Sequence, residues 1–131
     1  MPMLGGKRRQ EQIVSLVAGS CSNALRFFSF YDDTETGVID RIREFAPGRA
    51  FRLLGYGVKC QLDPGSTMLG IHRNGSGTPE ETITVDPGAA ATWIRKTTAI
   101  DFAANDRLAF GITATDYPAD VNAYIHVLWL E

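Results

Sequence analysis

The segment from Asp106 to Leu130 restricts the fold of this chain more than any other part of the sequence. Apolar side chains alternate with small or polar ones from Leu108 to Ala114, and this period of two is typical of a strand with one buried face. After a turn over 116–120, a second strand is expected over Ala123–Leu130. Its residues are apolar on both faces: Ile125, Val127 and Trp129 on one, and Tyr124, Leu128 and Leu130 on the other. Either this strand is central in its own domain, with the first strand folded over it, or one of its faces contacts another chain.

Turn signals separate short apolar or alternating segments along the rest of the chain. Pro-Gly pairs at 47–48, 64–65 and 87–88 predict tight turns, and Asn74–Gly77 predicts a hairpin loop. Further strands are expected over 12–18, 24–31, 38–45, 51–62, 67–73, 82–85 and 91–95. Short strands without an amphipathic helix predict an all-β fold of two packed antiparallel sheets. A jelly-roll-like sandwich is the first choice and an immunoglobulin-like sandwich the second.

The long strand expected over 51–62 contains two glycines that need an explanation. Its inward-facing set is predicted to be Leu54, Tyr56, Val58, Cys60 and Leu62. Gly55 and Gly57 then fall on the other face. Paired glycines in a strand indicate a β-bulge or the close approach of another backbone.

The length and charge of the chain limit its organisation. Its 131 residues, 44% hydrophobic and 21% charged, suit one globular domain over 13–131 behind a short flexible N-terminal arm over 1–12. A formal net charge of −2 argues against a nucleic-acid partner. No apolar run is long enough to span a bilayer or to act as a signal peptide, so we expect a soluble protein made inside a cell. Lys7, Arg8 and Arg9 are either solvated or form a basic arm that docks on an acidic partner.

The residue types that bind metals or perform catalysis are sparse. Cys21 and Cys60 are expected to be free thiols rather than a disulfide, and they are not closely spaced with His72 or His126, so no metal site is expected. The acidic cluster of Asp32, Asp33 and Glu35 reads as an ordinary turn because it lacks the spacing of an EF-hand calcium loop. The glycine-rich segment 73–79 lacks the Gly-Lys-Ser/Thr of a phosphate-binding loop. No nucleophile motif is present, so we expect no cofactor and no enzyme activity.

Two aromatic residues offer an alternative to a purely structural role. Trp93 and Tyr117 are the aromatics least tied to an alternating pattern. An exposed aromatic ring on a sandwich surface can stack on a sugar, which makes these two residues candidate glycan contacts. The competing interpretation places Trp93 in the core or at an oligomer interface, where aromatic residues are enriched.

Three segments together resemble the small β-sandwich modules of tailed-bacteriophage virions. They are the hairpin Gly70–Gly75, the segment Ala99–Ile112 that enters a strand through Asn105-Asp106-Arg107-Leu108, and the terminal strand Ala123–Leu130. These modules include capsid decoration (cement) proteins and fibre or tail tip domains. Asn105 stands where glycine is common in such modules. The resemblance covers roughly residues 50–131, and it implies a multimeric structural role in a virus particle with no catalytic residues.

These observations lead to a functional expectation. We expect a non-enzymatic capsid decoration protein in the virion, made in the bacterial host cytoplasm, that binds the major capsid protein or other virion proteins as a homo-oligomer, with a trimer favoured. Lys7, Arg8 and Arg9 are the expected partner-binding residues, and Tyr124, Leu128, Leu130 and Trp129 the expected oligomer interface. The alternative is a receptor- or glycan-binding module of a tail fibre or baseplate, with Trp93 and Tyr117 as the glycan contacts.

Overall fold

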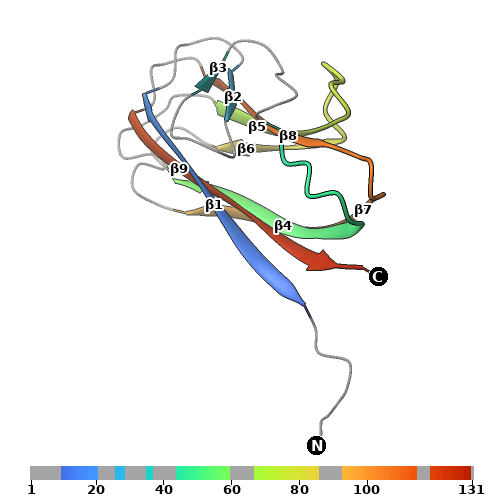
Figure 1. The fold of residues 1–131 in the computed structure, drawn as a ribbon. Coiled ribbons are helices and arrows are strands. Elements are labelled where there is room, and N and C mark those ends of the chain that lie inside the picture. The colour runs from blue at the N-terminus through green and yellow to red at the C-terminus, as the bar shows by residue number, and fades with distance from the viewer. Residues whose placement is uncertain are drawn as a thin grey trace, which may run out of the picture.

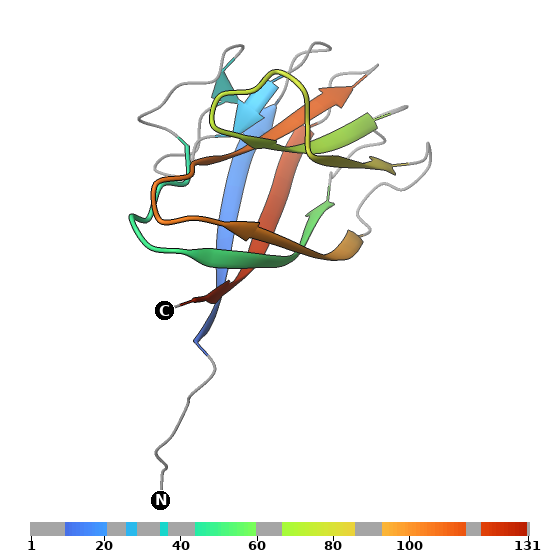
Figure 2. The same ribbon diagram turned by 90° about the vertical axis from the view of Figure 1, so that its right-hand side faces the viewer.

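The computed structural model describes residues 10–20, 26–28, 35–36, 44–59, 67–85, 93–114 and 119–130. These residues form two antiparallel sheets that face each other (Figures 1 and 2). The four-stranded sheet has the order β1 (Glu11–Ser20), β9 (Ala119–Trp129), β4 (Phe51–Lys59), β7 (Ile94–Phe102). The five-stranded sheet has the order β3 (Glu35–Thr36), β2 (Arg26–Phe28), β8 (Leu108–Ala114), β5 (Thr67–Arg73), β6 (Glu81–Val85).

The strand order is that of a jelly roll. When the short β3 is set aside, one sheet contains the first, eighth, third and sixth strands, and the other contains the second, seventh, fourth and fifth. Neighbouring strands therefore come from distant parts of the chain, and the first strand pairs with the last along nearly its whole length. This is the double Greek key arrangement of jelly rolls. The predicted all-β sandwich and its jelly-roll character are confirmed.

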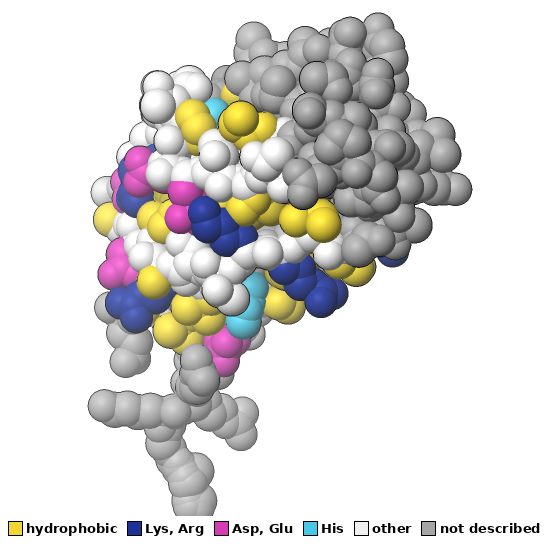
Figure 3. All heavy atoms as spheres, turned by 180° about the vertical axis from the view of Figure 1, so that it is seen from behind, with side chains coloured by type: hydrophobic (Ala, Val, Ile, Leu, Met, Phe, Trp, Pro, Cys, Tyr) yellow, Lys and Arg dark blue, Asp and Glu magenta, His cyan; other side chains and the backbone are white. Residues whose placement is uncertain are grey.

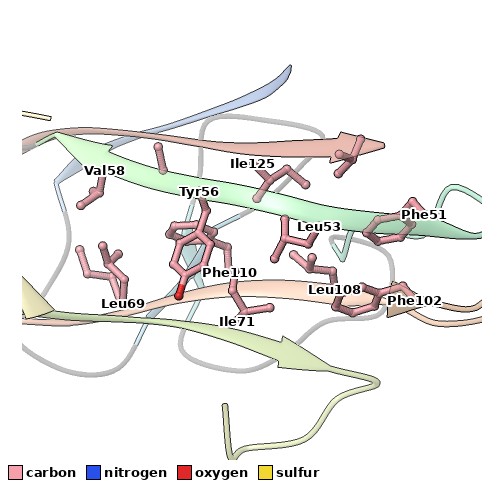
Figure 4. Packing of buried hydrophobic residues seen from close by; sticks show 13 residues of the cluster. Phe51, Leu53, Tyr56, Val58, Leu69, Ile71, Phe102, Leu108, Phe110 and Ile125 are labelled. Carbon is pink, nitrogen blue, oxygen red and sulfur yellow. The ribbon is translucent and has the colours of Figure 1, made fainter. Parts of the chain in front are cut away.

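The hydrophobic core fills the space between the two sheets (Figure 4). Phe51 and Phe102 stack with ring centroids 4.7 Å apart, and Tyr56 meets Phe110 edge to face at 5.9 Å. The Tyr56 side chain extends from β4 toward the five-stranded sheet, and burial is the main cause that raises the pKa of its hydroxyl. Fully buried aliphatic side chains complete the core: Leu53 and Val58 on β4, Leu69 and Ile71 on β5, Leu108 and Ile112 on β8, and Ile125 and Val127 on β9.

A β-bulge in β4 corrects the predicted inward-facing set. The register with both neighbouring strands shifts between Leu53 and Gly55. Relative to β9, β4 contains one extra residue there, which interrupts the alternation of its side chains. Leu53 is fully buried, whereas Leu54 is half-buried and lies outside the core cluster. The assignment of Leu54 to the core was wrong for this reason, and that of Tyr56 and Val58 is confirmed. Cys60 and Leu62 lie outside the described residues.

The other strand predictions are met to different degrees. The strand expected over 67–73 is found with those bounds, and the one expected over 91–95 is instead the longer β7. Inward positions of β7 include Lys96 and Thr98, which are polar, so alternation alone does not reveal the strand. Of the strand expected over 38–45 only the end is described, where Phe45 forms a single bridge with Leu108. Of the expected 24–31 segment, Arg26–Phe28 is described, as β2.

Candidate partner-binding face

The two faces of β9 have different surroundings. Ala123, Ile125 and Val127 are buried in the core, with relative exposures of 2%, 0% and 0%. Tyr124 and Leu128 point to the opposite side and are half-buried. β9 lies between β1 and β4 in the sheet, so β1 lies beside it and does not cover it. Of the two alternatives, the central position of this strand in its sheet is found, but β1 does not fold over its second face.

We call this outer side of the four-stranded sheet the open face, and the register arranges it in rows. One row runs Glu11, Leu128, Arg52, Asp101; a second runs Ile13, His126, Gly55, Thr97; a third runs Ser15, Tyr124, Gly57, Arg95. The glycines occupy the middle of two rows, so the centre of the face has no side chain of its own there. Ile13, at the β1 edge, is 55% exposed. The open face thus combines an exposed apolar side chain with two glycines at its centre, and the Tyr124 ring lies over one of them, Gly57.

Aromatic and cationic side chains gather at one end of the open face. The Trp93 and Tyr124 rings meet at 67° with their centroids 5.5 Å apart. The Lys59 ammonium and the Arg95 guanidinium lie 5.4 and 5.7 Å from the centroid of the Trp93 ring, within the range of cation–π attraction. Trp93 itself is half-buried. This end of the face therefore consists of two aromatic rings with positively charged side chains beside them.

Polar side chains contact one another across the other end of the open face. His126 Nε2 is 2.9 Å from the Glu11 carboxylate, and Arg52 holds Asp101 at 2.6 Å. The hydrogen bond from Arg52 is the main cause that lowers the pKa of Asp101. Both partners of the Arg52 pair are largely exposed, so the pair contributes little to stability. Figure 3 shows the molecule from behind, with hydrophobic side chains in small groups between acidic and basic ones.

The residues predicted to form the oligomer interface do not all lie on the same side of the sheet. Tyr124 and Leu128 lie on the open face. Trp129 is on the inner side, where its ring centroid lies 6.0 Å from that of Phe51 and 6.1 Å from that of Phe45. Leu130 follows β9, is half-buried and donates its backbone N–H to the Ala50 carbonyl. Lys7, Arg8 and Arg9, which were predicted to bind a partner, and Tyr117, which was predicted to contact a glycan, lie outside the described residues.

A polar network that sequence reasoning missed joins the loops at one end of the sandwich. Arg73 binds the Asp106 carboxylate at 2.8 Å and the Glu80 carboxylate at 3.1 Å, and its guanidinium lies 4.2 Å from the centroid of the Phe102 ring. Asn74 donates to Asp106 and accepts from the Arg107 backbone N–H. The network ties the β5–β6 loop to the β7–β8 loop. These side chains bind one another and hold the two loops together.

A second ion pair extends the same network to a third loop. The Arg107 Nε atom lies 3.0 Å from the carboxylate of Glu44, whose side chain is 1% exposed. Glu44 precedes Phe45, which forms two backbone hydrogen bonds with Leu108. No sequence motif pointed to this pair, because its members are 63 positions apart.

The described residues contain no arrangement of metal ligands. Within them, no group of three or more His, Cys, Asp and Glu side chains is placed to hold an ion. His72 is on β5 and His126 on β9, in different sheets. The side chains of Cys21, Cys60, Asp32, Asp33 and Glu35 lie outside the described part. In the residues that the structure covers, no helix is long and apolar enough to cross a membrane.

Comparison with known proteins yields a fold but no family. No protein-family model matches the chain, and no curated protein matches it. Among solved structures, the PRD1 vertex protein P5 is similar with a TM-score of 0.60 and 16% identity, over 97% of this chain and 100% of that chain. A structure titled "Bacillus endospore appendages form a novel family of disulfide-linked pili" aligns with a TM-score of 0.49 and 12% identity, over 100% of this chain and 96% of that one. The chain therefore shares its fold, over nearly its whole length, with the PRD1 vertex protein P5.

Proposed function

We propose that this chain is a non-enzymatic structural module of a virus particle, which assembles as a homo-oligomer and decorates the capsid shell. The main observation that supports this proposal is the set of apolar side chains on the open face. A jelly roll already encloses its core between two sheets, so apolar side chains on the outside of one sheet are not needed for folding. Ile13, Tyr124, Leu128 and Trp93 occupy that outer side together. Ile13 is exposed and the other three are half-buried, and apolar groups clustered in this way on one sheet are typical of surfaces that bind other proteins.

Two further observations support this proposal. The fold is shared with a protein whose name places it at a vertex. β1 is also an edge strand that begins at Glu11, and the basic residues Lys7, Arg8 and Arg9 come shortly before it in the sequence. An N-terminal segment at that position can reach a neighbouring subunit or the shell while the face itself is engaged. A trimer remains the favoured oligomer, and the major capsid protein the proposed partner.

The oligomeric part is tested by one pair of matched substitutions. Ile13 and Met68 are both exposed large apolar residues, at 55% and 49%, but they lie on different sheets. Sedimentation velocity at micromolar concentration should show an oligomer for the unaltered chain. Ile13→Lys should shift it toward monomer, and Met68→Lys should not. A monomer for the unaltered chain would overturn self-association, and equal effects of the two substitutions would remove the open face from it.

The particle-binding part is tested separately. The chain should copurify with virus particles in a fixed copy number per shell. Deletion of residues 1–9 leaves β1 whole, because that strand begins at Glu11. This deletion, and replacement of Lys7, Arg8 and Arg9 by serine, should weaken rebinding to stripped particles. Unchanged rebinding in both variants would remove the basic segment from the mechanism.

A glycan-binding module of a fibre or baseplate is the second candidate, and the surroundings of Trp93 favour it. The ring is half-buried, and Lys59 and Arg95 beside it supply hydrogen-bond donors for sugar hydroxyls. Trp93→Ala should then abolish glycan-array binding while the oligomer persists. A decoration role predicts the opposite pattern, with no glycan signal and weaker particle binding.

A further inference from the structure

A pocket of about 140 Å³ lies on the outer side of the five-stranded sheet, away from the open face. One row across this sheet runs Phe27, Gly111, Gly70, Thr82. The two glycines leave the middle of the row without side chains, so they form the floor of the pocket. Its walls include Met68, Pro79 and Gly77, together with the ring of His72.

His72 and Thr82 are the polar side chains that line this pocket, and His72 is 2% exposed. Its Nδ1 atom lies 2.9 Å from the Ser76 carbonyl oxygen. Because a carbonyl only accepts, Nδ1 carries the hydrogen and donates it. The edge of the Phe27 ring meets the imidazole at 76°, with centroids 5.1 Å apart, and fixes the orientation of the ring.

The other ring nitrogen of His72 is unused. Burial lowers the pKa of His72, which keeps the ring neutral at neutral pH, so Nε2 is an acceptor. Within the part of the chain that the structure describes, Nε2 has no hydrogen-bond partner. It lies over the glycine floor, since a Cβ added at Gly111 or Gly70 would be 3.0 or 3.2 Å from it. The pocket thus presents Nε2 as an unpaired acceptor in a largely apolar lining, in which Thr82 is the other polar side chain.

The volume of the pocket sets the size of what it can take. An engineered apolar cavity of about 150 Å³ binds benzene, so about 140 Å³ accommodates one six-membered ring. A ring without a donor would leave the buried Nε2 unsatisfied, which is unfavourable. We propose that this pocket binds a phenol-type group, an apolar ring whose hydroxyl donates to His72 Nε2. Such a group comes from a free small phenol or from a tyrosine side chain of another protein chain.

The first experiment uses p-cresol, the side-chain analogue of tyrosine, with toluene as the matched probe that lacks the hydroxyl. Titration followed by NMR should give a Kd for p-cresol of about 1 mM or tighter, with toluene at least about fivefold weaker. The ¹⁵N resonance of His72 Nε2 should shift with p-cresol alone. No saturable binding of p-cresol would overturn the site, and equal binding of toluene would overturn the role of Nε2.

The second experiment locates the site with two leucine substitutions in the same loop. A Cβ at Gly77 meets nothing within 4 Å, and its φ is not in the left-handed region, so Gly77→Leu is tolerated by the backbone and places a side chain at the pocket wall. Gly77→Leu should weaken p-cresol binding at least about tenfold. Thr78 is exposed and does not line the pocket, so Thr78→Leu should leave binding unchanged. Equal effects of both substitutions would place the binding elsewhere.

A third measurement separates the two sources of the phenol group. N-acetyltyrosinamide carries the same ring attached to a peptide backbone. Binding within about threefold of p-cresol shows that a tyrosine of another chain can enter, and selects that source. Binding at least about tenfold weaker selects a free small phenol. His72→Phe should remove the preference for p-cresol over toluene, and persistence of that preference would overturn the assignment of His72.

Discussion

The ring of Tyr124 lies over Gly57 on the open face. A Cβ added at Gly57 would be 2.6 Å from Tyr124 Cε1 and 2.9 Å from the carbonyl oxygen of Ile94. The tyrosine ring can turn away, but the Ile94 carbonyl belongs to the backbone of β7, which pairs with β4 at this position. The place of Tyr124 on the open face therefore depends on the absence of a side chain at position 57.

Gly57→Ala should accordingly destabilise the fold and displace Tyr124. Overpacking of this kind costs about 1–3 kcal/mol, which a urea titration measures as a lower free energy of unfolding. Gly77→Ala is the control, because a Cβ there meets nothing within 4 Å, and its effect should stay within about 0.5 kcal/mol. If the two alanine variants were equally stable, the close contact at Gly57 would be refuted.

Removal of Arg107 should be far more costly than removal of Arg52. Arg107 pairs with Glu44, whose side chain is 1% exposed and whose Oε2 has no hydrogen-bond partner. Arg107→Ala leaves that buried carboxylate uncompensated, at a cost of about 3–5 kcal/mol. Arg52→Ala breaks a pair whose side chains are 41% and 58% exposed, where solvent screens the attraction, so the loss of stability should be much smaller. Chemical denaturation of both variants tests the order, and a larger loss for Arg52→Ala would contradict it.

The fold could be predicted from local patterns because most strands carry a clear alternation. The turn residues and alternating segments identified β5 and β8 and the existence of two sheets. Alternation failed where one extra residue occurs, as at the bulge beside Leu53, and where inward positions are polar, as at Lys96 of β7. A search for strict alternation does not detect an inserted residue. A search for apolar positions does not identify a lysine whose side chain points inward.

The candidate sites were predicted less completely, for a different reason. Tyr124 and Leu128 were identified because both faces of β9 are apolar, which is visible in the sequence. The pair of Arg107 and Glu44 and the pocket at His72 were missed. Each arises from residues on separate strands that only the sheet order brings together. The glycines at 70 and 111 meet through β5–β8 pairing, and no signal in either segment alone predicts that pairing.

The free energy of unfolding should decrease as the pH is lowered, because His72 is buried in the folded chain. Burial lowers the pKa of the folded imidazole below its ordinary value of 6.5. Between the two values the unfolded chain binds a proton that the folded chain does not, so the free energy of unfolding falls as pH drops below 6.5. The contribution is at most about 1.4 kcal/mol per pH unit. Urea titrations between pH 7.5 and pH 5 measure this slope.

The variant His72→Gln tests whether the pH dependence of the free energy of unfolding is due to His72. Its absolute stability is expected to be lower, since glutamine does not reproduce the ring contact with Phe27. Only the pH dependence is compared, and the part due to His72 should disappear. The same slope in the variant would assign it to another group and contradict the neutral state of the buried ring.

Asn74→Gly should weaken the loop network without straining the turn. Asn74 has a φ of 52°, which glycine adopts readily, so the backbone can stay as it is. The change removes the hydrogen bond that Nδ2 donates to Asp106 at 2.8 Å and the one that Oδ1 accepts from the Arg107 N–H at 2.8 Å. Loss of these bonds should cost about 1–2 kcal/mol of unfolding free energy.

The sharper readout of this variant is the pKa of Asp106. The hydrogen bond from Asn74 is the first cause that holds this pKa below its ordinary value of 3.8, followed by the bond from the Ala103 N–H. In Asn74→Gly the pKa should rise but stay below 3.8, because Ala103 and Arg73 still contact the carboxylate. A ¹³C NMR titration of the side-chain carboxyl measures it. Asn105→Gly is the control in the neighbouring turn and should leave it unchanged, whereas an unchanged pKa in Asn74→Gly would show that Asn74 does not hold Asp106.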